Sequence, residues 1–177
     1  TVFAMTTVLS AFFGGLALGS YLFGKWTAKI KNTVIIYAIL EAGIGVFAFL
    51  FPLFLKIFGL LYSFIYGGIY QHSIILTATR FIIFAFLLLI PTTMMGGTLP
   101  LLSQYFIRNK ESIGTRTGIL YGINTFGAML GAFLCGFFFI RYIGVDTTNY
   151  LAGLASILVA LIAYFASRQI VCNSPES

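Results

Sequence analysis

Long apolar stretches separated by short polar segments dominate the chain. The apolar runs cover residues 2–23, 33–55, 74–107, 117–140 and 148–166. A helix needs about 20 apolar residues to cross the hydrocarbon core of a bilayer. A transmembrane β-strand would instead show about ten residues of alternating polarity, and these runs do not alternate. The pattern therefore predicts an all-α transmembrane bundle of about five spanning helices.

The third apolar run is too long for one straight span. At about 1.5 Å per residue, a helix over residues 74–107 would measure about 50 Å. Pro91 and Pro100 lie inside this run, so we expect either kinks at the two prolines or a helix end that extends beyond the bilayer. Residues 56–73 are rich in Tyr and interrupted by Gly. We expect them to form an interfacial segment, because Tyr and Lys favour the headgroup level.

Composition supports the membrane interpretation and limits the partners. Of 177 residues, 60% are hydrophobic and 8% are charged, whereas a soluble domain carries about 25% charged residues. Lipid must therefore cover most of the outer surface. The net charge of +6 is explained by basic loops on one side of a membrane, so we expect no nucleic-acid partner. Residues 1–168 are predicted to form a single transmembrane domain, and residues 169–177 a short polar tail.

The distribution of Lys and Arg predicts the orientation. Seven basic residues fall on one side of the predicted spans and three, Lys56, Arg80 and Arg141, on or towards the other. Because cytoplasmic loops carry an excess of Lys and Arg, the first side is expected in the cytoplasm, with the N-terminus outside and the C-terminus inside. The residues of the expected cytoplasmic side are Lys25, Lys29, Lys31, Arg108, Lys110, Arg116 and Arg168.

Small residues recur at four-residue spacing in two of the predicted helices. Gly15 and Gly19 lie in the first run. The fourth run carries two such pairs, Gly118 with Gly122 and Gly127 with Gly131. This spacing lets helix backbones approach closely in lipid. One interpretation is packing alone. The other is that close, smooth contacts let helices rock against each other, as transporters require.

Glu41 is the acidic residue with the strongest functional signal. It lies about 12 Å into the second predicted helix, a depth at which a carboxylate is costly and usually faces a cavity or a partner. Tyr37, Glu41, Gly45 and Ala48 share one stripe of that helix without a bulky aliphatic side chain. Glu41 is either a hydrogen-bonded structural pin between helices or a site for a cationic substrate or a proton.

Three further polar residues are candidates for binding a substrate or an ion. Arg80 lies in the outer part of the third run, about 9 Å along the bundle axis from the expected level of Glu41. It either approaches Glu41 or extends to the outer headgroups. Tyr121 and Asn124 lie in the fourth run, near the expected depth of Glu41. Asn124 is a candidate for a hydrogen bond between helices, since Asn commonly forms such bonds in lipid.

Enzyme motifs are absent from the sequence. The chain has no P-loop, no GxGxxG after a strand, no HExxH and no GxSxG. The two cysteines, Cys135 and Cys172, have no zinc-binding spacing. We therefore expect no catalytic residues, no metal site and no cofactor.

Four consecutive blocks of the chain resemble the membrane region of fused MFS/spermidine synthase proteins, in the order found in that family. They are VLSAFFGGLALGSYLFGKWTAKIKN (8–32), YAILEAGIGVFAFLFP (37–52), RFIIFAFLLLIPTTMMGGTLPLLSQYF (80–106) and GILYGINTFGAMLGAFLCGFFFIRYIG (118–144). These bacterial proteins join a helical half similar to the major facilitator superfamily (MFS) to a cytosolic aminopropyltransferase domain. The residues on the family's recurrent positions are Glu41, Arg80, Pro91, Gly96, Pro100, Asn124, Gly127 and Gly131.

The resemblance implies a fold, a location and two candidate functions. The fold would be an MFS half without its first helix, and the location the bacterial inner membrane. The synthase domain of the family is absent from this chain. The first implied function is transport of a small, cationic, polyamine-like solute by the module paired with itself or with another half. The alternative is a membrane anchor or scaffold for a cytosolic aminopropyltransferase (spermidine synthase) domain.

Overall fold

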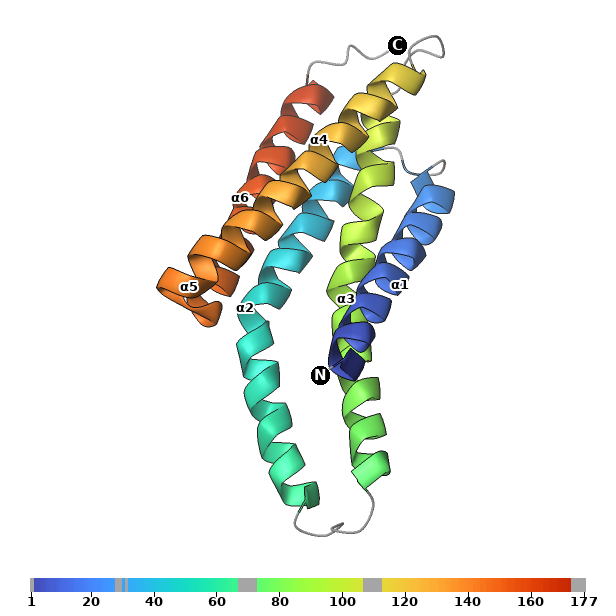
Figure 1. Ribbon diagram of the computed structural model, residues 1–177. Helices are drawn as coiled ribbons and strands as arrows, with labels where there is room; N and C mark the ends of the chain where they lie inside the picture. Colours follow the sequence, from blue (N-terminus) through green and yellow to red (C-terminus); the bar gives the residue numbers. More distant parts are fainter. Residues whose placement is uncertain (1, 28–29, 31, 67–72, 107–112, 173–177) are drawn as a thin grey trace.

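The computed structural model describes residues 2–27, 30, 32–66, 73–106 and 113–172, and within them the regular structure is helical throughout (Figure 1). The elements are α1 (Val2–Thr27), α2 (Thr33–Tyr66), α3 (Ser73–Phe106), α4 (Ile113–Leu134), the π-helical turn η2 (Cys135–Phe139), α5 (Ile140–Ile143) and α6 (Val145–Cys172).

Five segments of the described chain are long and apolar enough to cross a membrane. They are Met5–Thr27, Thr33–Leu60, Phe81–Phe106, Gly114–Ile143 and Val145–Gln169. The fourth segment joins α4, η2 and α5 into one span. The predicted all-α bundle with five spanning helices is therefore confirmed, and this architecture is that of an integral membrane protein.

The helices pack as two close pairs joined through α2 and α3. The most extensive contacts are those of α1 with α3 and of α2 with α6, and α2 also packs on α3. In contrast, α4 runs diagonally across the bundle and contacts α3 only lightly (Figure 1). The termini of α1, α3 and α6 at Thr27, Phe106 and Cys172 lie at the same end of the molecule as the start of α2 and α4 (Figure 1).

The predicted end of the second helix at residue 55 is wrong. The helix α2 continues through Pro52 and Lys56 to Tyr66, so most of the expected interfacial segment is helical, while Tyr70 and His72 lie outside the described residues. The lower ends of α2 and α3 extend beyond the other helices (Figure 1). This extension accounts for the excess length of the third apolar run, and α3 continues through both Pro91 and Pro100.

The remaining helix ends also differ from the sequence expectation by a few residues. The first helix includes Lys25, and α6 continues to Cys172, past the expected boundary at residue 168. Polar residues near a helix end are compatible with helical backbone, so hydropathy alone places such ends too early. Gly144, with φ of 82°, separates α5 from α6 in a conformation that favours glycine.

The contact between α1 and α3 is built on glycine. A Cβ at Gly15 would overlap the side chain of Thr92, and a Cβ at Gly19 would overlap the backbone of Thr93. On the opposite side, a Cβ at Gly96 would overlap the backbone of Leu16. The two backbones therefore approach closely only because these positions lack side chains, which is how helices without a hydrophobic driving force associate in lipid.

A second close contact joins α2 to α6. A Cβ at Gly45 would meet Ile157 and the carbonyl of Gly153, and a Cβ at Gly153 would meet Ala48. The stripe of α2 that lacks bulky aliphatic side chains therefore has two parts with different roles. Its first half holds Tyr37 and Glu41, and its second half, Gly45 and Ala48, is the packing surface for α6.

A proline inside α2 leaves a backbone carbonyl that α6 satisfies. Pro52 has no N–H and cannot donate to the carbonyl of Ala48, its partner one turn earlier. Asn149 of α6 donates its Nδ2 group to that oxygen at 2.6 Å. An unpaired carbonyl is costly in hydrocarbon, and a neighbouring helix can supply the missing donor.

The same arrangement recurs between α1 and α3. Pro100 cannot donate to the carbonyl of Gly96, and the hydroxyl of Ser20 on α1 donates to that oxygen at 2.9 Å. Both close helix pairs therefore combine small residues with a hydrogen bond to a carbonyl that a proline has released.

The expected close packing of the glycines in the fourth helix is not formed within this chain. A Cβ at Gly118, Gly122, Gly127 or Gly131 would meet nothing within 4 Å. The reason is the diagonal path of α4, which keeps its surface away from the other helices. The helix then passes through the π turn η2, where the N–H of Ile140 donates to the carbonyl of Cys135.

Asn32 fixes the start of α2 and joins it to the end of α6. Its Oδ1 accepts a hydrogen bond from the N–H of Ile35 at 3.2 Å, which is the N-cap geometry. Its Nδ2 donates to the hydroxyl of Ser167 at 3.0 Å, a side chain that is 1% exposed. The polar end of the bundle is thereby tied across two helices.

Candidate functional site

Glu41 is half-buried and hydrogen-bonded to two helices. The hydroxyl of Tyr37, one turn earlier on α2, donates to its carboxylate, and so does the hydroxyl of Ser156 on α6. These two donors replace part of the hydrogen bonding that water would give the carboxylate. Glu41 also lines a cavity between the helices.

A polar cavity of about 780 Å³ lies between the helices, and Glu41 forms part of its wall. Residues from α1, α2, α3, α4 and α6 line it. The polar side chains on its wall are Ser20, Glu41, Thr98, Ser103, Thr117, Tyr121, Asn124 and Ser156. The structure therefore brings together Glu41, Tyr121 and Asn124, three of the four residues that the sequence singled out as binding candidates.

The wall formed by α4 is one regular face of that helix. Thr117, Tyr121, Asn124 and Ala128 line the cavity, and their spacing of three or four residues places them on one side of an α-helix. The hydroxyl of Thr117 is buried without a hydrogen-bond partner in the described part of the chain. This face accordingly presents the phenol of Tyr121 and the amide of Asn124 to the cavity, beside the buried, unpaired hydroxyl of Thr117.

The wall formed by α1 and α3 contains the hydrogen-bonded proline site. Ser20, Gly96 and Pro100 all line the cavity, next to the apolar side chains of Phe12 and Leu16. The hydroxyl of Ser20 is already bound to the carbonyl of Gly96. This wall is therefore mainly an apolar surface, and the hydroxyls of Ser20 and Thr98 on it are paired with backbone carbonyls.

Arg80 lies far from Glu41 along the bundle. Glu41 shares the cavity with Met95 of α3, and Arg80 lies roughly fifteen residues before Met95, about 22 Å along a helix. The side chain of Arg80 lies outside the described part of the chain, so its expected approach to Glu41 stays a prediction.

Three of the described basic residues, Lys25, Arg116 and Arg168, lie near one end of the bundle, whereas Lys56 lies in the second half of α2 and Arg141 in α5. Lys25 lies in the last turn of α1, and Arg116 donates from Nη1 to the carbonyl of Phe106 at 3.2 Å, which satisfies the end of α3. The guanidinium of Arg168 lies 5.2 Å from the ring centre of Tyr164. The other expected loop residues, Lys29, Lys31, Arg108 and Lys110, lie outside the described residues.

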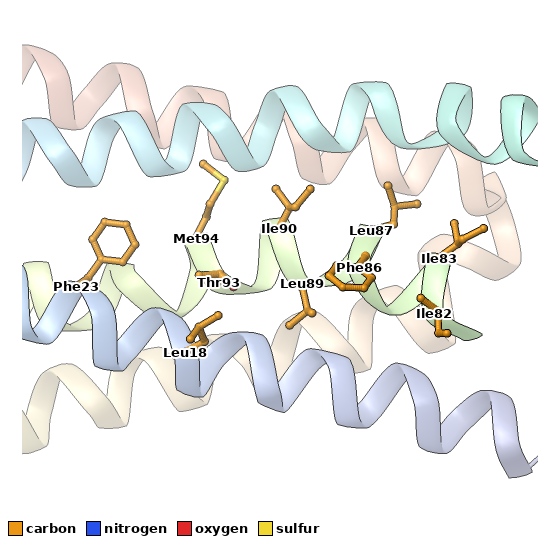
Figure 2. Close-up of a pocket in the computed structure, with 10 residues that line it drawn as sticks. All are labelled: Leu18, Phe23, Ile82, Ile83, Phe86, Leu87, Leu89, Ile90, Thr93 and Met94. Carbon is orange, nitrogen blue, oxygen red and sulfur yellow. The ribbon is translucent and has the colours of Figure 1, made fainter. Parts of the chain in front are cut away.

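A second hollow, of about 820 Å³, follows the groove between α1 and α3 and has a different character (Figure 2). Thr93 is its only polar residue, and the others are aliphatic, aromatic or Met. In Figure 2, Leu89 points towards α1, and Met94 and Ile90 point to the opposite side. This surface suits acyl chains or another helix, so the polar cavity is the candidate functional site.

Sequence reasoning missed two parts of this site. Thr117 precedes Tyr121 by four residues, and this spacing was available as a signal for the polar face of α4. Ser156 lies among apolar residues of α6, and its contact with Glu41 depends on how α2 and α6 cross. Among the described residues, no cluster of three or more His, Cys, Asp or Glu side chains forms that would hold a metal ion.

Comparisons of the chain with protein-family models, curated proteins and solved structures find no match. The function must therefore be inferred from the cavity itself.

Proposed function

We propose that this chain is a membrane module that binds a small solute in the polar cavity and moves it across the bilayer. The observation that carries the proposal is the position of Glu41 on the wall of the cavity that the polar face of α4 also lines. A polar cavity inside a bundle of membrane helices is where solute sites of secondary transporters lie. An intramembrane carboxylate is by default a candidate for such a site.

The finer features of the proposal come from the resemblance to fused MFS/spermidine synthase proteins. It favours a cationic, polyamine-like solute and a location in the bacterial inner membrane, with the N-terminus outside and the C-terminus in the cytoplasm. It also favours association with a second copy or with another half. In support of the last point, the α4 side of the cavity is bounded by a helix that packs only lightly on the rest of the chain.

Uptake of radiolabelled amines into proteoliposomes tests the proposal. The variant Glu41→Gln removes the cavity carboxylate with little change in shape, and we expect it to abolish uptake while the purified protein keeps its elution volume. The matched control is Asp146→Asn, which removes one negative charge in the exposed first turn of α6, and we expect it to keep uptake near the wild-type rate.

Two results would contradict the proposal. Uptake that is equal in wild-type, Glu41→Gln and protein-free liposomes would exclude transport of the tested amines through this site. If, in addition, the chain retained a cytosolic aminopropyltransferase at the membrane in a pull-down, the anchor function would replace transport.

A further inference from the structure

The polar cavity has a simple charge pattern. Among the described residues on its wall, Glu41 is the only carboxylic acid, and there is no Lys, Arg or His. The other polar groups there are hydroxyls and the amide of Asn124. The cavity therefore offers one carboxyl group surrounded by neutral donors and acceptors.

Much of the remaining wall is apolar. Phe12 and Leu16 of α1, Ile44 of α2, and Met95 and Leu99 of α3 line the same cavity. A ligand that places a charge at Glu41 would have to lay the rest of its surface against these side chains. The cavity volume of about 780 Å³ lies within the range of sites that hold drug-sized molecules, about 300–1,000 Å³.

From this pattern we infer that the ligand of the cavity is an organic cation with a single positive charge and an apolar, aromatic or aliphatic body. The inference rests on the proposed function and narrows its substrate class. The cationic group pairs with the carboxylate of Glu41. The amide of Asn124 and the hydroxyl of Thr117 lie on α4, which lines the same cavity. The apolar body of the ligand contacts the wall formed by α1 and α3.

A polyamine fits this wall less well, although the resemblance favours one. Only one of its ammonium groups can pair with Glu41, and each further ammonium meets hydroxyls or apolar surface. An uncompensated charge inside a membrane protein is strongly unfavourable. An anion is excluded more directly, because it would lie beside the Glu41 carboxylate without a basic partner among the described wall residues.

Two fluorescent dyes that share one ring system separate these substrate classes. Ethidium carries one positive charge and propidium carries two, and both report binding through a change in fluorescence. The full chain, reconstituted in lipid nanodiscs, is titrated with each dye, and signal from empty nanodiscs is subtracted. Unlabelled spermidine is then added as a competitor.

We expect saturable binding of ethidium to wild-type protein and to Asp146→Asn, and about 30-fold weaker binding to Glu41→Gln, since losing one partner of a desolvated charge pair has effects of that size. Propidium should bind about tenfold more weakly than ethidium, and spermidine should not displace ethidium. The comparison of the three ligands on wild-type protein remains decisive even if Glu41→Gln does not fold.

Two other outcomes overturn the inference in different ways. If propidium or spermidine binds at least as tightly as ethidium and depends on Glu41, the single-charge class is wrong and the proposed cation site stands. If none of the three shows saturable binding to folded wild-type protein, the inference fails together with the cation site of the proposed function.

Discussion

Gly15 and Gly19 of α1 have the same four-residue spacing as Gly127 and Gly131 of α4, yet the two pairs have different surroundings. The α1 glycines lie against Thr92 and Thr93 of α3, whereas a Cβ at either α4 glycine would meet nothing within 4 Å in the described part of the chain. The spacing makes a helix able to accept a close neighbour. Whether one is present depends on the path of the helix, and α4 crosses the bundle diagonally (Figure 1).

The comparison extends to the polar groups of the two regions. In the closely packed helix pairs, a hydroxyl and an amide side chain donate to backbone carbonyls that have no helical donor because Pro100 and Pro52 lack an N–H. On α4, Tyr121 and Asn124 are exposed at the cavity. Polar side chains thus stabilise contacts in one region and remain available to a ligand in the other.

The largest effect is expected at Gly96. The substitution Gly96→Leu would drive a side chain into the backbone of Leu16, and overpacking of this kind costs about 3 kcal/mol. The matched control is Gly122→Leu on α4, where nothing lies within 4 Å. The free energy of unfolding in mixed micelles measures both, and equal losses would show that the two regions do not differ in packing.

The next effect is expected from the donor to the carbonyl of Ala48. Asn149→Ala leaves this carbonyl unpaired, which should lower the free energy of unfolding by about 2 kcal/mol. In a Pro52→Ala background the N–H of residue 52 can donate to Ala48, so the same substitution should cost much less. A double-mutant cycle with no coupling between the two sites would disprove this account of the α2–α6 contact.

A smaller effect is expected at Gly144, the residue between the lightly packed and the closely packed parts. Its φ of 82° is unfavourable for a residue with a side chain, so Gly144→Ala should cost about 1 kcal/mol. Thermal unfolding in detergent measures the loss. A stabilised variant would mean that the turn adopts another conformation in the membrane.

The smallest effect, within about 0.5 kcal/mol, is expected for Gly127→Leu in the monomer. The free energy of unfolding of the monomer is measured at a low protein-to-detergent ratio. Chemical crosslinking at a high protein-to-detergent ratio measures the amount of dimer. Loss of crosslinked dimer with unchanged monomer stability would show that a second copy covers α4. A large loss of monomer stability would contradict the open surface of this helix.

The sequence was sufficient to predict the spans because lipid imposes a minimum length of apolar helix on every crossing. It was insufficient at Tyr66 and Cys172, where helices continue past the apolar region. It did not reveal that Asn149 of a neighbouring helix supplies the hydrogen bond that Pro52 removes. Helix ends in a membrane protein therefore depend on partners that hydropathy does not describe.

The candidate site was predictable in part for a similar reason. Glu41, Tyr121 and Asn124 are conspicuous because polar groups are rare at this depth, and all three line the cavity. Ser156 is a common residue in an apolar helix, and its role depends on the α2–α6 crossing. The expected pairing of Arg80 with Glu41 stays a prediction, because the side chain of Arg80 lies outside the described part of the chain.

The π turn η2 has a consequence for how the fourth span tolerates changes in length. A π turn holds one residue more than the matching α-helical turn, and the wider turn takes up that residue so that the helix after it keeps its orientation. Deleting one residue within Cys135–Phe139 would restore α-helical hydrogen bonds in this turn. The face of α4 that lines the cavity and the residues of α5 would each keep the neighbours they have now. Relatives of this chain are therefore expected to differ by single-residue gaps at this turn more readily than at Gly96, where a register shift would move a side chain into α1.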